Sequence, residues 1–149
     1  MAIVSKLKES IPLILLLLLM AGAAVWLLNP MDPIHGITAE EIERIELLRG
    51  SEAVVELSEA EQAELVPLLS EMRLWGFPTT TLENIDGLLS QMFRLVLRGG
   101  RELEVAAGGG YYILNGVGYR LGYDYELGEA ISSLYTELFE QYTGRWPYG

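Results

Sequence analysis

The stretch Tyr111–Tyr119, YYILNGVGY, predicts a β-hairpin and indicates the fold class of the chain. Asn115-Gly116 is the preferred pair for a type I′ turn, because both residue types tolerate a positive φ angle. A two-residue turn at this point pairs Tyr112 with Tyr119 on one face of the hairpin. Side chains that share a face in this way pack against a core, so we expect an antiparallel sheet here.

A second hairpin is predicted just before the first, across Gln91–Ala107. A two-residue loop would pair leucine with a charged residue, which register rules disfavour. We therefore expect a three-residue loop that pairs Leu97 with Leu103 and Leu95 with Val105.

The C-terminal region predicts one long amphipathic helix. Asp124 can cap its start, and Gly144 can end it. Apolar residues recur along it at helical spacing, and they are Leu127, Ile131, Leu134, Leu138 and Tyr142. We expect this stripe to pack on one face of the sheet.

The first part of the domain predicts a hairpin followed by a shorter helix. The hairpin spans Ile42–Leu57, and a capping box of Ser58 and Glu61 starts the helix. Pro67 is expected to kink this helix or to split it after Val66. The predicted fold class is α+β, with one domain in which two helices pack on an antiparallel sheet of hairpins.

An uncharged apolar stretch, Ile11–Leu28 (IPLILLLLLMAGAAVWLL), precedes the domain. A helix of about 18 residues is about 27 Å long, close to the thickness of a bilayer's hydrocarbon core. Lys6 and Lys8 precede it, so the positive-inside rule places the N-terminus in the cytoplasm. We expect a single-pass protein of the cell membrane, with a cytoplasmic n-region (1–10), a transmembrane signal anchor (11–28), a linker (29–36) and an extracytoplasmic domain (37–149).

A cleavable signal peptide is the alternative interpretation, because Ala21-Gly22-Ala23 has the small-residue pattern of a cleavage site. The apolar run continues past that point to Leu28, and Trp26 suits a membrane interface. These two features favour the anchor. A lipid-anchored protein is excluded, because the chain has no cysteine to carry the lipid.

The formal net charge is -11, which bears on the class of partner. Proteins bind nucleic acid by neutralising phosphates, so an acidic exterior argues against nucleic acid. It argues equally against docking on anionic lipid head groups. The membrane is therefore expected as a partner only through the N-terminal helix, and any further partner is expected to be neutral or basic.

No motif in the chain predicts catalysis. The sequence has no H-E-x-x-H, no G-x-S-x-G and no P-loop, and Gly108–Gly110 is expected to be a flexible connector between hairpins. We assign no catalytic, cofactor-binding or metal-binding residue, and we expect no cofactor. His35 stands alone in the linker. Asp124, Glu126 and Glu129 could hold Ca²⁺ weakly, but a helix N-terminus explains them better.

Tyrosine is the residue type that points to binding, since all 8 tyrosines lie from Tyr111 onward. Tyrosine is enriched at interfaces, and the long predicted loop Pro78–Gly87 is a natural contact surface. The candidate partner-binding residues are Tyr111, Tyr123, Tyr125, Thr80 and Asn84. The predicted function is a non-enzymatic accessory module that binds a neighbouring surface protein or a cell-wall polymer; a hydrolase using paired glutamates and a sensory input domain are the alternatives.

The runs Phe93–Leu97, Tyr111–Gly116 and Tyr119–Leu121, together with the closing helix, resemble small uncharacterised extracytoplasmic α+β domains of Gram-positive bacteria. The resemblance covers Ile37–Tyr142. Many such domains are lipoproteins, and this chain departs from them by lacking the lipidated cysteine. The resemblance implies a membrane-anchored surface domain and no particular activity.

Overall fold

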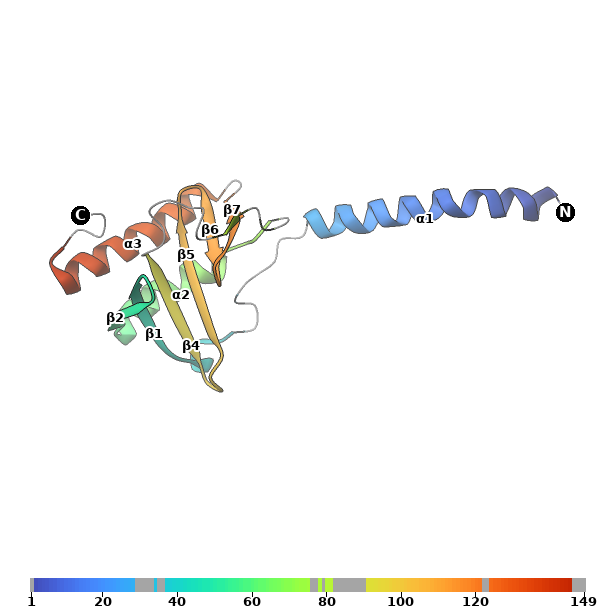
Figure 1. The fold of residues 1–149 in the computed structure, drawn as a ribbon. Helices are drawn as coiled ribbons and strands as arrows, with labels where there is room; N and C mark the ends of the chain where they lie inside the picture. The colour runs from blue at the N-terminus through green and yellow to red at the C-terminus, as the bar shows by residue number, and fades with distance from the viewer. Residues whose placement is uncertain are drawn as a thin grey trace.

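The chain has an α+β fold, as the sequence predicts. The computed structural model describes residues 2–28, 34, 37–75, 78, 80–81, 91–121 and 124–145. Over these residues it contains three α-helices and one antiparallel sheet, with α2 and α3 on the same face of the sheet (Figure 1).

The described elements follow one another as α1 (Ala2–Leu28), the 3₁₀ turn η1 (Ala39–Glu41), β1 (Ile42–Arg49), β2 (Glu52–Glu56), α2 (Glu59–Glu71), β3 (Thr80–Thr81), β4 (Met92–Leu97), β5 (Glu102–Gly108), β6 (Tyr111–Leu114), β7 (Val117–Arg120) and α3 (Tyr125–Thr143). The strand order is β2-β1-β4-β5-β6-β7-β3, and β3 adds only a two-residue edge.

Strands β4 to β7 form a continuous meander. The type I′ hairpin is confirmed, with Tyr112 opposite Tyr119. The expectation of a flexible connector at Gly108–Gly110 is wrong, because β5 also pairs with β6 and Gly108 lies opposite Tyr111. Gly109 and Gly110 form the tight turn of this extra hairpin with φ angles of 58° and 84°, which glycine adopts without strain.

The β4–β5 hairpin differs from its predicted register. The three-residue loop Arg98–Gly100 is present, and the Leu97 N–H donates to the Arg101 carbonyl at 2.8 Å. Leu95, rather than Leu97, therefore lies opposite Leu103. A shift of two residues leaves every side chain on its predicted face, so the core is unaffected.

The main core lies between the sheet and its two covering helices. From the helices it takes Leu65, Leu69, Ile131, Leu134, Tyr135, Leu138 and Phe139, all buried. The Tyr135 ring meets the Phe93 ring edge-on with centroids 5.6 Å apart, and its hydroxyl donates to the Leu48 carbonyl of β1. These contacts attach α3 to the middle of the sheet.

Three details of the helices depart from expectation. Helix α2 is not split after Val66, because it runs through Pro67, which lies at an exposed position of the helix. Asp124 occupies the N-cap position of α3, but its side chain makes no capping hydrogen bond. Tyr142 is 40% exposed rather than part of the buried stripe. Gly144 ends α3 as predicted, with a φ angle of 65°.

Helix α1 is continuous and starts well before the predicted anchor. Its stretch Ile3–Trp26 is long and apolar enough to cross a membrane. All of its described side chains are exposed, and Figure 1 draws it apart from the sheet and the other helices. Large apolar side chains that are exposed along a whole helix are the expected pattern for a helix that meets lipid.

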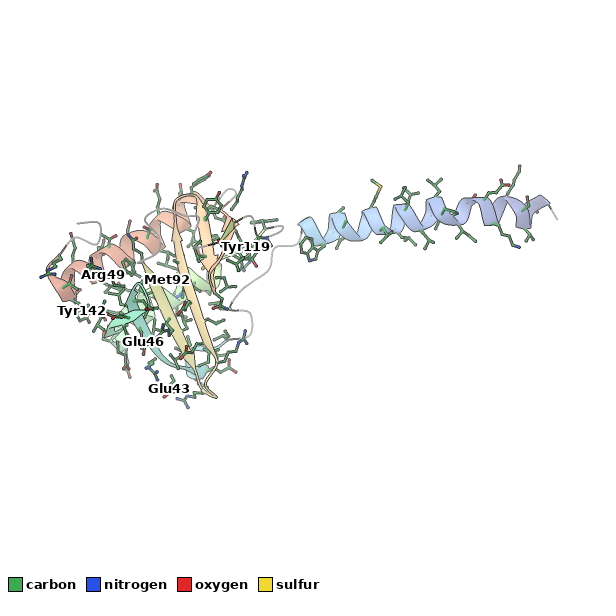
Figure 2. The ribbon with its side chains drawn as sticks, viewed as in Figure 1. Glu43, Glu46, Arg49, Met92, Tyr119 and Tyr142 are labelled. Atoms are coloured by element: carbon green, nitrogen blue, oxygen red, sulfur yellow. The ribbon has the colours of Figure 1, made fainter. Side chains whose placement is uncertain are left out.

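The sheet face opposite the helices is partly charged and partly apolar. Arg94 on β4 lies 3.2 Å from Glu46 on β1 and 3.0 Å from Glu104 on β5. The hydrogen bonds that Arg94 donates to Glu104, together with the charges of the surrounding carboxylates, raise the pKa of Arg94. A small buried cluster of Leu48, Met92, Ala106 and Ile113 adjoins this network, and Figure 2 labels Glu46 and Met92 on this sheet.

Candidate partner-binding site

The two described candidate tyrosines lie in different surroundings. Tyr125 is the first residue of α3, and its side chain is 60% exposed. Tyr111 on β6 is half-buried and packs against the apolar cluster on the helix-free face of the sheet. Helix α3 covers the other face, so the structure does not bring these tyrosines onto one surface. Tyr125 is the one that remains available for contact.

The predicted loop is not a single irregular stretch. Thr80 and Thr81 form β3, and the Thr80 backbone lies opposite Gly118 at the edge of the sheet. Tyr123 and Asn84 lie outside the described residues, as does most of the predicted Pro78–Gly87 loop.

A hollow of about 620 Å³ lies between the C-terminal half of α2 and the start of α3. We call it the α2–α3 hollow, and its lining is Leu68, Glu71, Asp124, Tyr125, Glu126, Leu127 and Ala130. Three of these side chains are carboxylates, and the remainder are apolar or aromatic. Because the Asp124 carboxylate does not cap α3, it is free of the N–H groups of its own helix.

Tyr125 borders a second hollow of about 390 Å³ on its other side. This glycine hollow is formed by the β5–β6 turn Gly108–Gly110, Leu121, and Tyr125, Gly128, Glu129, Ser132 and Ser133 of α3. A Cβ atom on Gly128 would lie 2.8 Å from Leu121 Cδ1, so glycine is what lets α3 approach Leu121 this closely. Tyr125 therefore stands between two concave surfaces.

Tyr112 on β6 is buried in the main core, between the sheet and its covering helices. Its side chain is 0% exposed, and within the described part of the chain its hydroxyl has no hydrogen-bond partner. Burial raises the pKa of this hydroxyl far above its usual range, and the charges of Asp124 and Glu71 raise it further. Both carboxylates belong to the lining of the α2–α3 hollow, whereas Tyr112 itself is not part of that lining.

Another hollow, of about 780 Å³, lies elsewhere, between the start of β1, the end of β2 and α2. Two of the polar residues that line it, Ser58 and Gln62, make hydrogen bonds within the fold. Ser58 and Glu61 bond each other in the predicted capping box, and Gln62 Nε2 donates to the Leu57 carbonyl at 3.1 Å. None of the candidate residues lines it, so we place the candidate site at Tyr125.

The described residues offer little to metal or glutamate-pair chemistry. Within them, no group of three or more His, Cys, Asp or Glu side chains is placed to hold a metal ion, so Asp124, Glu126 and Glu129 are not arranged for the weak Ca²⁺ site that was the less favoured interpretation of these residues. Glu46 and Glu104 lie close in the structure because they share Arg94. Both carboxylates are therefore ion-paired with Arg94 and have a structural role in the sheet.

Sequence reasoning identified Tyr125 but missed Glu71 and Tyr112. Asp124 and Glu126 flank Tyr125 in the sequence, whereas Glu71 ends α2 and Tyr112 lies inside β6. Only the packing of α2 beside α3 brings Glu71 to the hollow that Asp124, Tyr125 and Glu126 also line. The signal for this site in the sequence was the pair of acidic residues on either side of Tyr125, Asp124 and Glu126.

Comparison of the chain with protein-family models, with curated proteins and with solved structures finds no significant match. The resemblance to Gram-positive surface domains therefore stays an expectation, and function is argued from the geometry of the site.

Proposed function

We propose that this chain is a single-pass membrane protein whose extracytoplasmic domain, residues 37–149, binds a neighbouring surface protein. The length and apolar exposure of α1 support the anchor. Lys6 and Lys8 before the apolar run support an N-terminus in the cytoplasm. The partner is then a molecule at the outer face of the same membrane.

The observation that carries the binding proposal is the position of Tyr125. A side chain of this size, 60% exposed between two hollows, offers contact area that the fold itself does not use. Its Cα is held by a helix that is firmly packed on the sheet, so little conformational freedom is lost on binding. Tyrosines of this kind are enriched among interface residues that dominate affinity.

Charge narrows the class of partner. The α2–α3 hollow carries Glu71, Asp124 and Glu126, and Glu129 lines the glycine hollow. Together with the net charge of -11, these carboxylates repel acidic surfaces and attract neutral or basic ones. A binding module explains this surface better than a hydrolase with paired glutamates, because the neighbouring carboxylates Glu46 and Glu104 are both ion-paired with Arg94.

Site-specific photo-crosslinking in intact membranes tests this function. A benzophenone side chain replaces Tyr125 in the full chain, and a matched variant carries it at Tyr142, which is exposed at the other end of the same helix (Figure 2). We expect a discrete protein adduct from position 125 and none from position 142.

Equal labelling from both positions, or none from either, contradicts a partner site at Tyr125. If the adduct is instead heterogeneous in mass and a cell-wall hydrolase removes it, the partner is a cell-wall polymer and not a protein.

A further inference from the structure

We propose that the groove between the start of β1 and α2 binds an extended, basic segment of another protein, which adds to the sheet as a further strand. This β1–α2 groove is the hollow of about 780 Å³ described above. It shares no lining residue with the two hollows beside Tyr125, so the inference does not depend on the partner site proposed there. An open strand edge, a backbone carbonyl that points into the groove and the charge of the lining support it.

The first half of β1 is an open edge of the sheet. β1 is eight residues long, but β2 pairs with it only over its second half, from Glu46 onward. Among the described residues, Ile42–Arg44 therefore has a strand neighbour on one side only, in β4. Figure 2 labels Glu43 in this open part and Glu46 where the pairing with β2 begins. An open edge of this kind can accept a strand from another chain.

The edge is open because the chain leaves it at Ser58. The preceding residue, Leu57, still bonds to β1, and its N–H donates to the Ile45 carbonyl at 2.8 Å. Ser58 is the N-cap of α2, and Gln62 of that helix donates from Nε2 to the Leu57 carbonyl. Helix α2 then forms a wall of the groove beside the open half of β1.

A backbone carbonyl of the open edge points into the groove. The Glu41 carbonyl accepts the Arg98 N–H at 2.8 Å, so it points toward the end of β4. Ile42 has extended backbone angles, with φ -83° and ψ 115°, and the carbonyl of an extended residue points opposite to that of the residue before it. The Ile42 carbonyl therefore points away from β4, to the side on which Ile42 lines the groove. An N–H of an added strand can donate to it.

The size and the apolar wall of the groove suit an extended segment. Its volume lies within the range of about 300–1,000 Å³ that is usual for ligand sites. Helix α2 lines it with Ala63, Val66 and Pro67, of which Ala63 and Pro67 are exposed and Val66 is half-buried. Side chains of a strand alternate between two faces, so every second side chain of the segment can contact this wall.

The charge of the lining favours a basic segment. The lining contains the carboxylates of Glu43, Glu56 and Glu59 and one guanidinium, that of Arg98. Glu43 lies 3.6 Å from Arg44, so Glu56 and Glu59 carry most of the attraction for a cation. A second copy of the chain would bring further negative charge, since the net charge is -11. A different and basic protein is therefore the matching occupant.

Peptide titration of the isotope-labelled full chain in neutral detergent micelles tests the inference. The probe is the peptide VKVKV, acetylated and amidated at its ends. One control is VEVEV, which has the opposite charge. The other is VKVKV with every backbone amide methylated, which keeps the charge but has no N–H to donate. We expect VKVKV to cause saturable shifts of the backbone amide resonances of residues 42–45 and 56–58, with nuclear Overhauser contacts to Ile42, and each control to bind at least about tenfold more weakly.

Several results of this titration overturn the proposal. The absence of binding by VKVKV does so directly. Equal binding of VKVKV and its methylated form shows that charge alone attracts the peptide. Shifts confined to residues outside the groove show that the peptide binds elsewhere. Shifts of residues 42–45 that depend on protein concentration without any peptide show that the occupant is a second copy of the chain.

Two glutamates of β2 provide a matched pair of charge variants. Glu52 and Glu56 are both exposed and lie at opposite ends of the strand, but only Glu56 lines the groove. We expect Glu56→Gln to weaken binding of VKVKV by about threefold, as for the loss of one exposed ion pair, and Glu52→Gln to leave it nearly unchanged. Equal losses in both variants overturn a defined site.

Two alanines of α2 provide a matched pair of steric variants. Ala63→Trp places a large ring in the groove, and Ala60→Trp makes the same change at an exposed position three residues earlier, outside the lining. We expect Ala63→Trp to weaken binding by about tenfold or more and Ala60→Trp to leave it unchanged, with similar thermal midpoints because both positions are exposed. Undiminished binding by Ala63→Trp overturns the proposal.

This inference and the proposed function can fail separately. If a specific adduct forms at Tyr125 but VKVKV does not bind, the partner surface at Tyr125 stands and the strand site falls. If VKVKV binds in the β1–α2 groove but positions 125 and 142 label equally, the strand site stands and the partner surface at Tyr125 falls.

Discussion

The Tyr142 hydroxyl donates to the Glu61 carboxylate, at 2.6 Å from Oε1 and 2.8 Å from Oε2. Tyr142 lies in the last turn of α3, and Glu61 lies in the first turn of α2. Glu61 also accepts the Ser58 N–H at 2.8 Å. One carboxylate therefore caps its own helix and holds the end of its neighbour.

This shared carboxylate predicts a pH-dependent contribution to stability. Burial opposes ionisation of Glu61, but hydrogen bonds from Tyr142 and Ser58 outweigh it and lower its pKa. A lowered pKa in the folded state means that the stabilisation is complete above the ordinary value and is lost as the pH falls through the folded value. Tyr142→Phe should therefore lower the free energy of unfolding slightly at pH 7 and by a smaller amount at pH 3, as measured by urea denaturation. Tyr125→Phe is the matched control, and a deficit that does not shrink at pH 3 contradicts the assignment.

The bond from the Tyr135 hydroxyl to the Leu48 carbonyl is buried, so its loss should be measurable. Tyr135→Phe keeps the ring contacts and leaves a buried carbonyl without this donor. We expect a loss of about 1–3 kcal/mol in the free energy of unfolding. Chemical denaturation measures it, and an unchanged midpoint with an unchanged slope shows that another donor replaces the hydroxyl.

Shortening a core side chain of α3 should lower the free energy of unfolding more than the loss of this hydrogen bond does. Leu134 faces the sheet from α3 and is nearly buried. Leu134→Ala should lower the free energy of unfolding by about 2–5 kcal/mol through lost burial and a residual cavity. Glu140→Ala, at an exposed position of the same helix, should change it by less than about 0.5 kcal/mol. Similar losses in both variants would place the core elsewhere.

The proposed anchor predicts that the full chain resists alkaline extraction from membranes and retains its N-terminus. Leu18→Arg places a charge near the middle of the apolar run, at a cost of about 2.5–3.5 kcal/mol for insertion, and should shift protein to the soluble fraction. Leu18→Val is the control. The intact mass of the protein decides between an anchor and a cleaved signal peptide. A species that begins near Ala24 shows that the segment has been cleaved and that the protein is secreted.

Local signals in the sequence predicted the elements well. Asn115-Gly116 sets its turn through backbone preferences of two adjacent residues, and the Ser58–Glu61 box starts α2 in the same local way. The β4–β5 register was harder, because leucines at every second position fit either of two pairings that differ by two residues. The loop conformation selects one of them.

The site depended on packing that the sequence does not encode locally. The helical spacing of Tyr142 matches the apolar stripe, but Tyr142 reaches Glu61 at the surface, where a hydroxyl has a better partner than the core. Tyr112 was predicted to be buried, and it is. Nothing in the order of residues indicates that its hydroxyl has no hydrogen-bond partner within the described part of the chain, since that depends on how the helices pack on the sheet.

Strand β2 has a consequence for copies of the protein that the proposed anchor would hold in one membrane. It forms an outer edge of the sheet, and it begins and ends with exposed glutamates, Glu52 and Glu56. Confinement to a plane raises the frequency with which domains collide, and an open strand edge is a template for pairing with a neighbour. Two such edges would bring four carboxylates together on contact. Repulsion between them keeps crowded copies apart without a covering helix or loop.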